Sequence, residues 1–254
     1  MSVKNWTRDE LLLTFNLYCR TPFGRLHRNN PEIISLAQNI SRTPSAVAMK
    51  LVNFASFDPV QQARQIRGLS NSSRADREIW DEFNANPEQL AFESQQALLQ
   101  FTGKNEEIAE AEISLPSGPT ESTRLVRTRL VQNFFRDAVL SSYEFKCAIC
   151  NLDLPELLSA SHIIPWSKNV ERRADPRNGL SLCAIHDRAF DRGLLSVGES
   201  FDILLSTRAR LHSSGSRLHL VALLEAEGKM ISLPKRFSPD PEALAYHREH
   251  IFKR

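Results

Sequence analysis

In the first hundred residues, apolar side chains recur at the three- and four-residue spacing of amphipathic helices. Thr7 and Glu10 form a capping-box pattern before the first run, and Pro31 and Pro44 stand at the first positions of the next two. Residues 76–100 continue with a further helical pattern. The predicted buried stripes of the first three helices are formed by Leu11, Leu12, Phe15, Ile33, Ala37, Ile40, Val47, Leu51 and Phe54.

The second and third of these helices, joined by a short polar turn, have the outline of a helix-turn-helix. Ser45, Lys50 and Asn53 lie off the apolar stripe of the third helix, and Arg42 precedes it. These four residues are the predicted DNA contacts of an N-terminal recognition domain. A plain three-helix bundle without a ligand has the same pattern, so this alternative stays open.

The pattern changes after residue 101. Residues 102–121 are rich in acidic residues, Pro, Gly and Ser, which is typical of a linker, and residues 122–140 return to an amphipathic helical spacing. Residues 194–205 then predict a β-hairpin. We therefore expect an α+β protein with a helical domain at 1–101, a linker at 102–121 and a second domain at 122–254.

The distribution of charged residues along the chain is more informative than the net charge. The 254 residues carry a net charge of +2, yet residues 1–57 hold seven Lys or Arg against three acidic residues, and residues 105–120 hold four Glu and no cation. Basic modules around an acidic tether suit a polyanionic partner, although a solvated surface of mixed charge would look the same. No apolar run reaches membrane-spanning length and no secretory leader precedes the first helix, so we expect a cytoplasmic protein without membrane contact.

The cysteines indicate a metal site. Cys147 and Cys150 form a C-x-x-C pair, and Cys183 with His186 form a second pair at the same spacing. Four such ligands can close a tetrahedral shell around Zn²⁺ and leave no open position, so the predicted role is structural. Unligated buried thiols are the alternative, and Cys19, which stands apart in a helical pattern, is expected to be one.

Between and beyond these pairs lie residues suited to acid–base and metal chemistry. His162 lies in a short apolar strand pattern, where a hairpin would present a single imidazole. Asp187 and Asp191 are four residues apart in a helical stretch, so their carboxylates share one face. His186 lies about 100° around the same helix and can turn to the zinc instead.

This region resembles the HNH endonuclease family. The resemblance covers about residues 130–200 and rests on CAIC at 147–150, SHIIPW at 161–166 and NGLSLCAIHDRAFDRG at 178–193. It implies a ββα-metal domain stapled by structural zinc. It also implies that His162 is the general base, that Asn178 braces the loop carrying it, and that Asp191 binds a catalytic divalent ion with Asp187 as a possible second ligand.

This sequence departs from the family pattern at two places that affect which catalytic metal ion is expected. Many members carry Asp or His just before the base, where this chain has Ser161, and both helix positions that are often His are Asp here. Oxygen ligands favour hard ions, so Mg²⁺ or Mn²⁺ is the expected catalytic metal. Arg188 and Arg192 flank the carboxylates and are predicted phosphate contacts, although solvated arginines are equally common.

The N-terminal region also resembles a recurrent segment of restriction-type HNH proteins, through WTRDEL at 6–11 and SRTPSAVAMKLVNF at 41–54. The two resemblances together imply a restriction or defence endonuclease that hydrolyses DNA phosphodiester bonds, with a homodimer if both strands are cut. The alternatives are a non-catalytic zinc-containing DNA-binding regulator, a nuclease acting on RNA, and a purely structural zinc protein.

Overall fold

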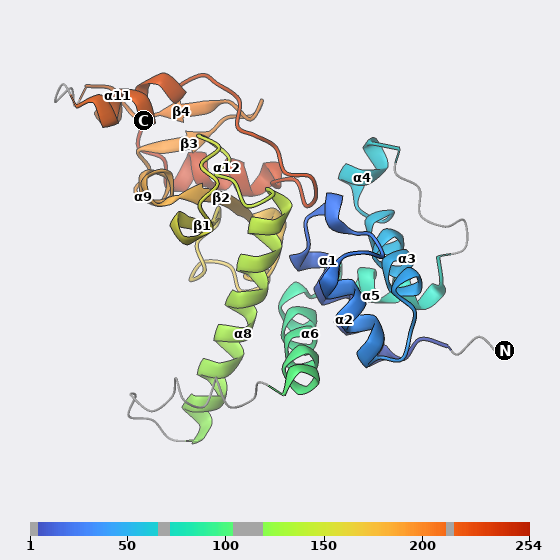
Figure 1. Ribbon diagram of the computed structural model, residues 1–254. Helices are drawn as coiled ribbons and strands as arrows, with labels where there is room; N and C mark the ends of the chain where they lie inside the picture. The colour runs from blue at the N-terminus through green and yellow to red at the C-terminus, as the bar shows by residue number, and fades with distance from the viewer. Residues whose placement is uncertain (1–4, 66–71, 104–118, 212–215) are drawn as a thin grey trace. The chain divides into compact units, whose positions relative to one another are not determined.

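The computed structural model describes residues 5–65, 72–103, 119–211 and 216–254 (Figure 1). The chain divides into two compact units, Met1–Ala138 and Val139–Arg254, and the division falls inside helix α8 (Pro119–Ser142). The predicted linker at 102–121 lies for the most part outside the described residues, so the predicted domain limits stay a prediction. No described helix is both long enough and apolar enough to cross a membrane.

The described part of the first unit is helical, and its helices begin where the sequence predicts. The Thr7 hydroxyl accepts the Glu10 amide at 3.2 Å while the Glu10 carboxylate accepts the Thr7 amide at 2.9 Å, so the capping box is present. Asn30 and Thr43 cap the next two helices. The elements are α1 (Arg8–Arg20), η1 (Phe23–Arg25), α2 (Pro31–Asn39), α3 (Pro44–Ala55), α4 (Pro59–Ala63), α5 (Arg74–Ala85), α6 (Pro87–Thr102) and most of α8.

Helix α1 is the centre of this unit and packs against α2, α3, α5 and α6. Its Phe15 is fully buried, with ring centroids 5.3 Å from Phe54 of α3 and 5.0 Å from Phe83 of α5. Tyr18 and Trp80 extend the same aromatic cluster. The helical stripes read from the sequence therefore meet in one core.

The second unit is built on two short antiparallel hairpins with helices around them. Strand β1 (Leu158–His162) pairs with β2 (Gly179–Cys183) so that His162 lies opposite Gly179, and α9 (Ala184–Asp191) packs against both strands. This is the predicted ββα unit, and the class of the chain is α+β. The remaining elements are η2 (Pro155–Leu157), η3 (Pro176–Asn178), the predicted hairpin β3 (Leu195–Val197) and β4 (Ile203–Leu205), α10 (Thr207–Leu211), α11 (Arg217–Ala222), η4 (Leu224–Ala226) and α12 (Pro241–His250).

The exit from α9 is fixed by a glycine. Gly193 has φ +67°, and a Cβ at this position would lie 2.0 Å from the Ile251 carbonyl oxygen, so no other residue fits without movement of the backbone. The Gly193 carbonyl accepts the Lys253 amide at 2.9 Å. The C-terminal segment is thereby held against the end of α9.

Candidate active site and metal centre

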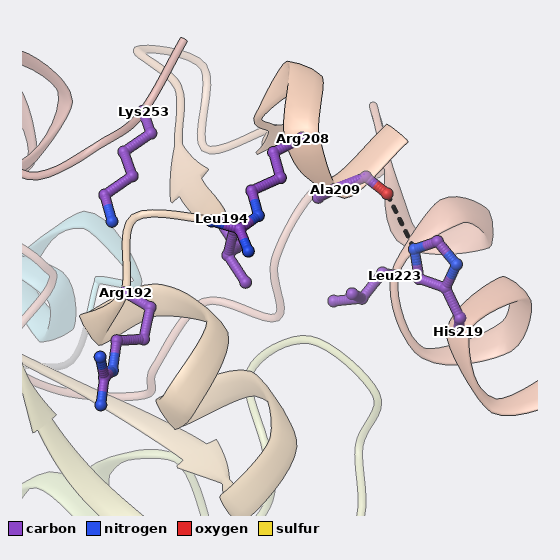
Figure 2. Close-up of a pocket in the computed structure, with 7 residues that line it drawn as sticks. All are labelled: Arg192, Leu194, Arg208, Ala209, His219, Leu223 and Lys253. Atoms are coloured by element: carbon purple, nitrogen blue, oxygen red, sulfur yellow. Dashed lines mark hydrogen bonds between the residues drawn. The ribbon is translucent and has the colours of Figure 1, made fainter. Parts of the chain in front are cut away.

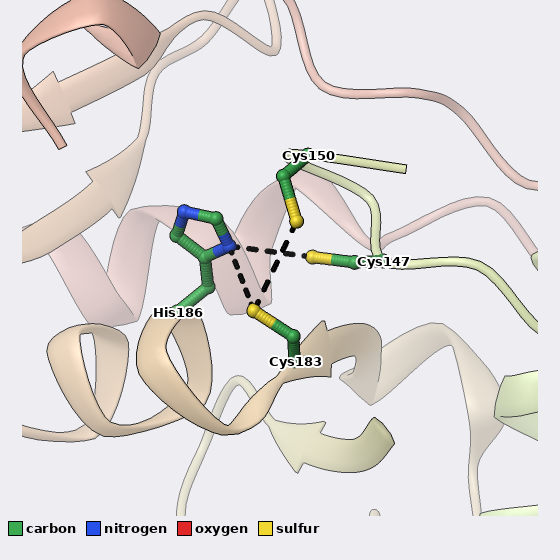
Figure 3. A group of neighbouring side chains, drawn as sticks. All are labelled: Cys147, Cys150, Cys183 and His186. Atoms are coloured by element: carbon green, nitrogen blue, oxygen red, sulfur yellow. Dashed lines mark hydrogen bonds between the residues drawn. The ribbon is translucent and has the colours of Figure 1, made fainter. Parts of the chain in front are cut away.

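Three cysteines and a histidine of the second unit converge on one point (Figure 3). Cys147 and Cys150 lie in the turn that follows α8, Cys183 ends β2, and His186 lies in the first turn of α9. A backbone hydrogen bond of 2.7 Å from the Ala148 amide ties the turn to β2. The hairpin and the helix thus bring together the two ligand pairs that the sequence predicts.

The spacing of the ligand atoms fits a tetrahedral ion. His186 Nδ1 lies 3.2 Å from Cys183 Sγ and 3.4 Å from Cys147 Sγ, and the Cys150 and Cys183 sulfurs are 3.9 Å apart. Zinc–ligand bonds of normal length place tetrahedral sulfurs about 3.8 Å apart and a sulfur and a nitrogen about 3.5 Å apart. The cluster can therefore bind a metal ion such as zinc, with all four positions filled by protein.

Neighbouring groups set the orientation of His186 and the ionisation of the cysteines in this cluster. The Ala222 carbonyl lies 2.8 Å from His186 Nε2, so Nε2 carries the hydrogen and the lone pair of Nδ1 faces the sulfurs. A hydrogen bond from the Cys147 thiol lowers the pKa of Cys183, whereas burial raises the pKa of Cys150. A thiolate at Cys183 is the form that binds metal.

His162 is half-buried at the end of β1, and its ring is held from two sides. Its Nε2 lies 3.0 Å from the Arg173 carbonyl, and its ring meets Trp166 edge-on with centroids 5.6 Å apart. Because a carbonyl only accepts, Nε2 carries the hydrogen and the neutral ring has its lone pair on Nδ1. Burial lowers the pKa of His162 below its ordinary value, which keeps the ring neutral near pH 7.

Asn178 is buried and links the two ends of the loop that connects β1 to β2. Its Oδ1 accepts the Ile164 amide at 2.8 Å, and its Nδ2 donates to the carbonyls of Ile164 at 3.1 Å and Arg172 at 3.3 Å. Ile164 is two residues after His162, and Arg172 directly precedes Arg173, whose carbonyl accepts the hydrogen bond from the imidazole. These hydrogen bonds join the start of the loop to its end, and the bracing role that the family resemblance implies stays a prediction.

The two carboxylates of α9 lie one helical turn apart. Burial raises the pKa of Asp191, and the neighbouring Asp187 carboxylate raises it further. A cation bound between them would relieve this repulsion. Among the described residues no third His, Cys, Asp or Glu joins them in a metal-binding group. Arg188 and Arg192 are exposed beside them.

The family comparison matches this stretch. A model of the HNH endonuclease family covers residues 147–198, from the first cysteine of the metal cluster to the end of β3, and includes His162, Asn178 and both carboxylates. Residues 147–198 form an HNH endonuclease domain. The match supports nuclease activity for this HNH domain and leaves the first unit outside it. No curated protein matches the chain.

The structure differs from the sequence prediction on α3. Lys50 and Asn53 are buried, and both contact Asp76 of α5: Lys50 forms an ion pair with it, and Asn53 Nδ2 donates to it at 2.9 Å. The predicted exposure of these two residues is therefore wrong. Asp76 also completes the capping box of α5 with Ser73, so its side chain satisfies a helix end and an interhelical contact at once.

Arg42 is also engaged within the first unit. Its guanidinium donates to Glu10 at 2.8 Å and to the Asn5 carbonyl at 2.7 Å, and it stacks on Trp6 at 4.7 Å from the ring centroid. Ser45, at the start of α3, is the exposed member of the four predicted contacts.

Two positioning contacts of the second unit were missed by sequence reasoning. The Arg173 carbonyl orients His162, and the Ala222 carbonyl orients His186. A backbone carbonyl is common to every residue type, so no sequence signal could have found either. The Arg173 side chain adds a stacking contact with Trp166, with the guanidinium 4.9 Å from the ring centroid.

Proposed function

We propose that the HNH domain is a metal-dependent endonuclease that hydrolyses DNA phosphodiester bonds. The observation that carries the proposal is the hydrogen bond between His162 Nε2 and the Arg173 carbonyl. Because this bond places the hydrogen on Nε2, the neutral ring has its lone pair on Nδ1. The strand that ends in His162 packs against α9, which carries Asp187 and Asp191. A proton acceptor and two carboxylates are the residue types that phosphodiester hydrolysis requires.

In this mechanism His162 Nδ1 takes a proton from a water molecule as the water oxygen attacks phosphorus. The bond between phosphorus and the 3′ oxygen breaks, and a solvent proton completes the 3′-hydroxyl, leaving a 5′-phosphate on the other fragment. Asn178 contributes by holding the backbone on both sides of the His162 loop, so that Nδ1 keeps its direction. Arg188 and Arg192 are exposed donors for the neighbouring phosphates.

Asp187 and Asp191 are the proposed ligands of Mg²⁺ or Mn²⁺. Two carboxylates fit an ion that keeps several waters and takes its remaining ligands from phosphate. When bound, such an ion supplies stabilisation of negative charge on the phosphate and on the leaving oxygen.

The proposed setting is a restriction or defence enzyme of the cytoplasm. This rests on the sequence resemblance of residues 6–11 and 41–54 to restriction-type HNH proteins. One such site cuts one strand, so cleavage of a duplex needs a homodimer or two successive nicks. Sedimentation with and without DNA tests the dimer, and a monomer in both states contradicts it.

The test of the nuclease is plasmid cleavage with Mg²⁺ and with Mn²⁺, comparing wild type, His162→Ala and the exposed control His250→Ala. We expect His162→Ala to lower the cleavage rate by a factor of about 10²–10⁴ while DNA binding stays unchanged, and His250→Ala to cut normally. If the wild type binds DNA without cleaving it, the result favours a non-catalytic DNA-binding regulator. If it cleaves RNA and not DNA, the proposed substrate is wrong and the protein is a nuclease acting on RNA.

The pH profile of cleavage checks the same residue. A protonated His162 cannot accept a proton, so activity falls as pH falls through its pKa. Because burial lowers that pKa, we expect the rate to hold its plateau below about pH 6.5 and to decline only at lower pH. Single-turnover rates over about pH 5 to 8 measure it, and a decline centred above 6.5 contradicts the assignment.

A further inference from the structure

A cavity of about 400 Å³ lies in the second unit, and none of the four Cys₃His residues lines it. It is bounded by the segment after α9, by α10 and α11, and by the C-terminal segment. Figure 2 shows the cationic side chains Arg192, Arg208 and Lys253 on one side and Leu223 with His219 on the other. Its lining residues are Arg192, Leu194, Arg208, Ala209, His219, Leu223 and Lys253.

The cavity concentrates positive charge. Burial raises the pKa of the neighbouring Asp191 carboxylate, and the Arg192 cation lowers that pKa in part without forming an ion pair with it. Among the described residues, no carboxylate forms an ion pair with Arg192, Arg208 or Lys253. Arg210, two residues along α10, is different because it pairs with Glu227. Three cations around one hollow repel one another, and a bound anion with several oxygens would relieve that repulsion and accept their hydrogen bonds.

The rest of the lining is suited to more than an anion. Leu194, Ala209 and Leu223 give apolar walls, and His219 is pinned by a 2.8 Å hydrogen bond between its Nε2 and the Ala209 carbonyl. A surface phosphate contact needs no such walls. The volume falls within the range of pockets that enclose small organic ligands. A ligand with one phosphate and one body that packs against apolar side chains matches both parts of the lining.

We propose that this cavity binds a nucleotide, with its phosphate against Arg192, Arg208 and Lys253 and its base against the apolar walls. Arg192 directly follows Asp191, and the Gly193–Lys253 hydrogen bond holds the C-terminal cation at the end of α9. The nucleotide is therefore one of the strand under cleavage, close to the scissile phosphate. This placement in the strand rests on the proposed nuclease function, whereas the nucleotide chemistry of the cavity does not.

The test is titration of the full chain with a deoxynucleoside 5′-monophosphate and with inorganic phosphate, followed by calorimetry. We expect the nucleotide to bind about tenfold more tightly than phosphate, because its base fills the apolar part. Arg208→Ala should weaken nucleotide binding about tenfold or more, and the matched control Arg210→Ala should not. Melting curves establish that both variants fold. Absence of nucleotide binding, or equal losses in the two variants, overturns the proposal.

A short single-stranded oligodeoxynucleotide then distinguishes the source of the nucleotide. Displacement of the mononucleotide by the oligonucleotide supports the strand placement, and no displacement overturns it in favour of a free nucleotide. Plasmid cleavage separates this inference from the proposed function. If the nucleotide binds but nothing is cut, the nuclease proposal fails and the cavity stands. If DNA is cut and Arg208→Ala binds nucleotide as Arg210→Ala does, the cavity proposal fails alone.

Discussion

Both units of this chain pair cations with carboxylates, and the second unit does so at Arg172, Arg177, Arg210 and Arg248. The second unit also gathers cations that form no such pair around one cavity. In the first unit cations face carboxylates of the same unit, as in the pairs Arg8–Glu82, Arg8–Glu93, Arg42–Glu10, Lys50–Asp76 and Arg127–Glu88. In the second unit Arg188, Arg192, Arg208 and Lys253 form no ion pair within the described residues, and three of them surround a cavity. A cation that forms an ion pair within its unit stabilises the fold, whereas a cation without such a partner can bind a ligand. The number of basic residues does not distinguish the two.

The units also differ in what stabilises them. The first has a cluster of buried aromatic rings around Phe15. The second has two hairpins of short strands, and its ββα element is joined to the preceding turn through the Cys₃His cluster. We therefore expect the second unit to depend on a metal ion and the first to be independent of it.

Loss of the metal is the change with the largest expected effect. Structural zinc contributes about 10–16 kcal/mol in small zinc-dependent domains, so Cys183→Ser or a strong chelator should unfold much of the second unit. Helical circular dichroism from the first unit should remain. Elemental analysis should find one zinc per wild-type chain and none in the variant.

Cys19→Ala is the matched control for this experiment, because Cys19 is a buried cysteine of α1 outside the cluster. It should keep its zinc and its second unit. Retention of zinc and of near-ultraviolet circular dichroism by Cys183→Ser would show that the two units do not differ in this respect.

Removal of a buried cation from the first unit should have the next largest effect. Lys50→Ala leaves the fully buried Asp76 without its charged partner, and breaking such a pair costs about 3–5 kcal/mol. Urea denaturation of the variant should show this loss. Ser45→Ala, on the exposed start of the same helix, should change the free energy of unfolding by less than about 0.5 kcal/mol. Equal effects of the two substitutions would contradict the structural role of Lys50.

The case of Lys50 shows where sequence reasoning reached its limit in the first unit. Helix starts depend on local signals, so the cap at Thr7 and the helix starts at Pro31 and Pro44 were predicted correctly. Whether a polar residue beside an apolar stripe faces solvent depends on a partner from elsewhere in the chain. Asp76 is that partner for Lys50, and the sequence around α3 does not predict this contact.

In the second unit the metal cluster was predictable because matched spacing constrains all four ligands at once. The ββα order followed from the same motif. The carbonyls that orient His162 and His186 carry no sequence signal. Neither does the cavity, because Arg192, Arg208 and Lys253 come from three separate segments that only the fold brings together.

The smallest expected effect on stability, and the sharpest test of the difference between the units, comes from an exposed cation of the second unit. Arg188 has no ion-pair partner among the described residues, so Arg188→Ala should change the free energy of unfolding by less than about 0.5 kcal/mol. If it contacts a DNA phosphate, the slope of log Kd against log salt should fall by about 0.9, because one fewer counterion is released on binding. Lys50→Ala should show the reverse, a large loss of stability with an unchanged slope in conditions where it is folded. A variant of Arg188 that is destabilised, or that binds DNA with the wild-type salt dependence, would show that this arginine serves the fold or solvent and not the substrate.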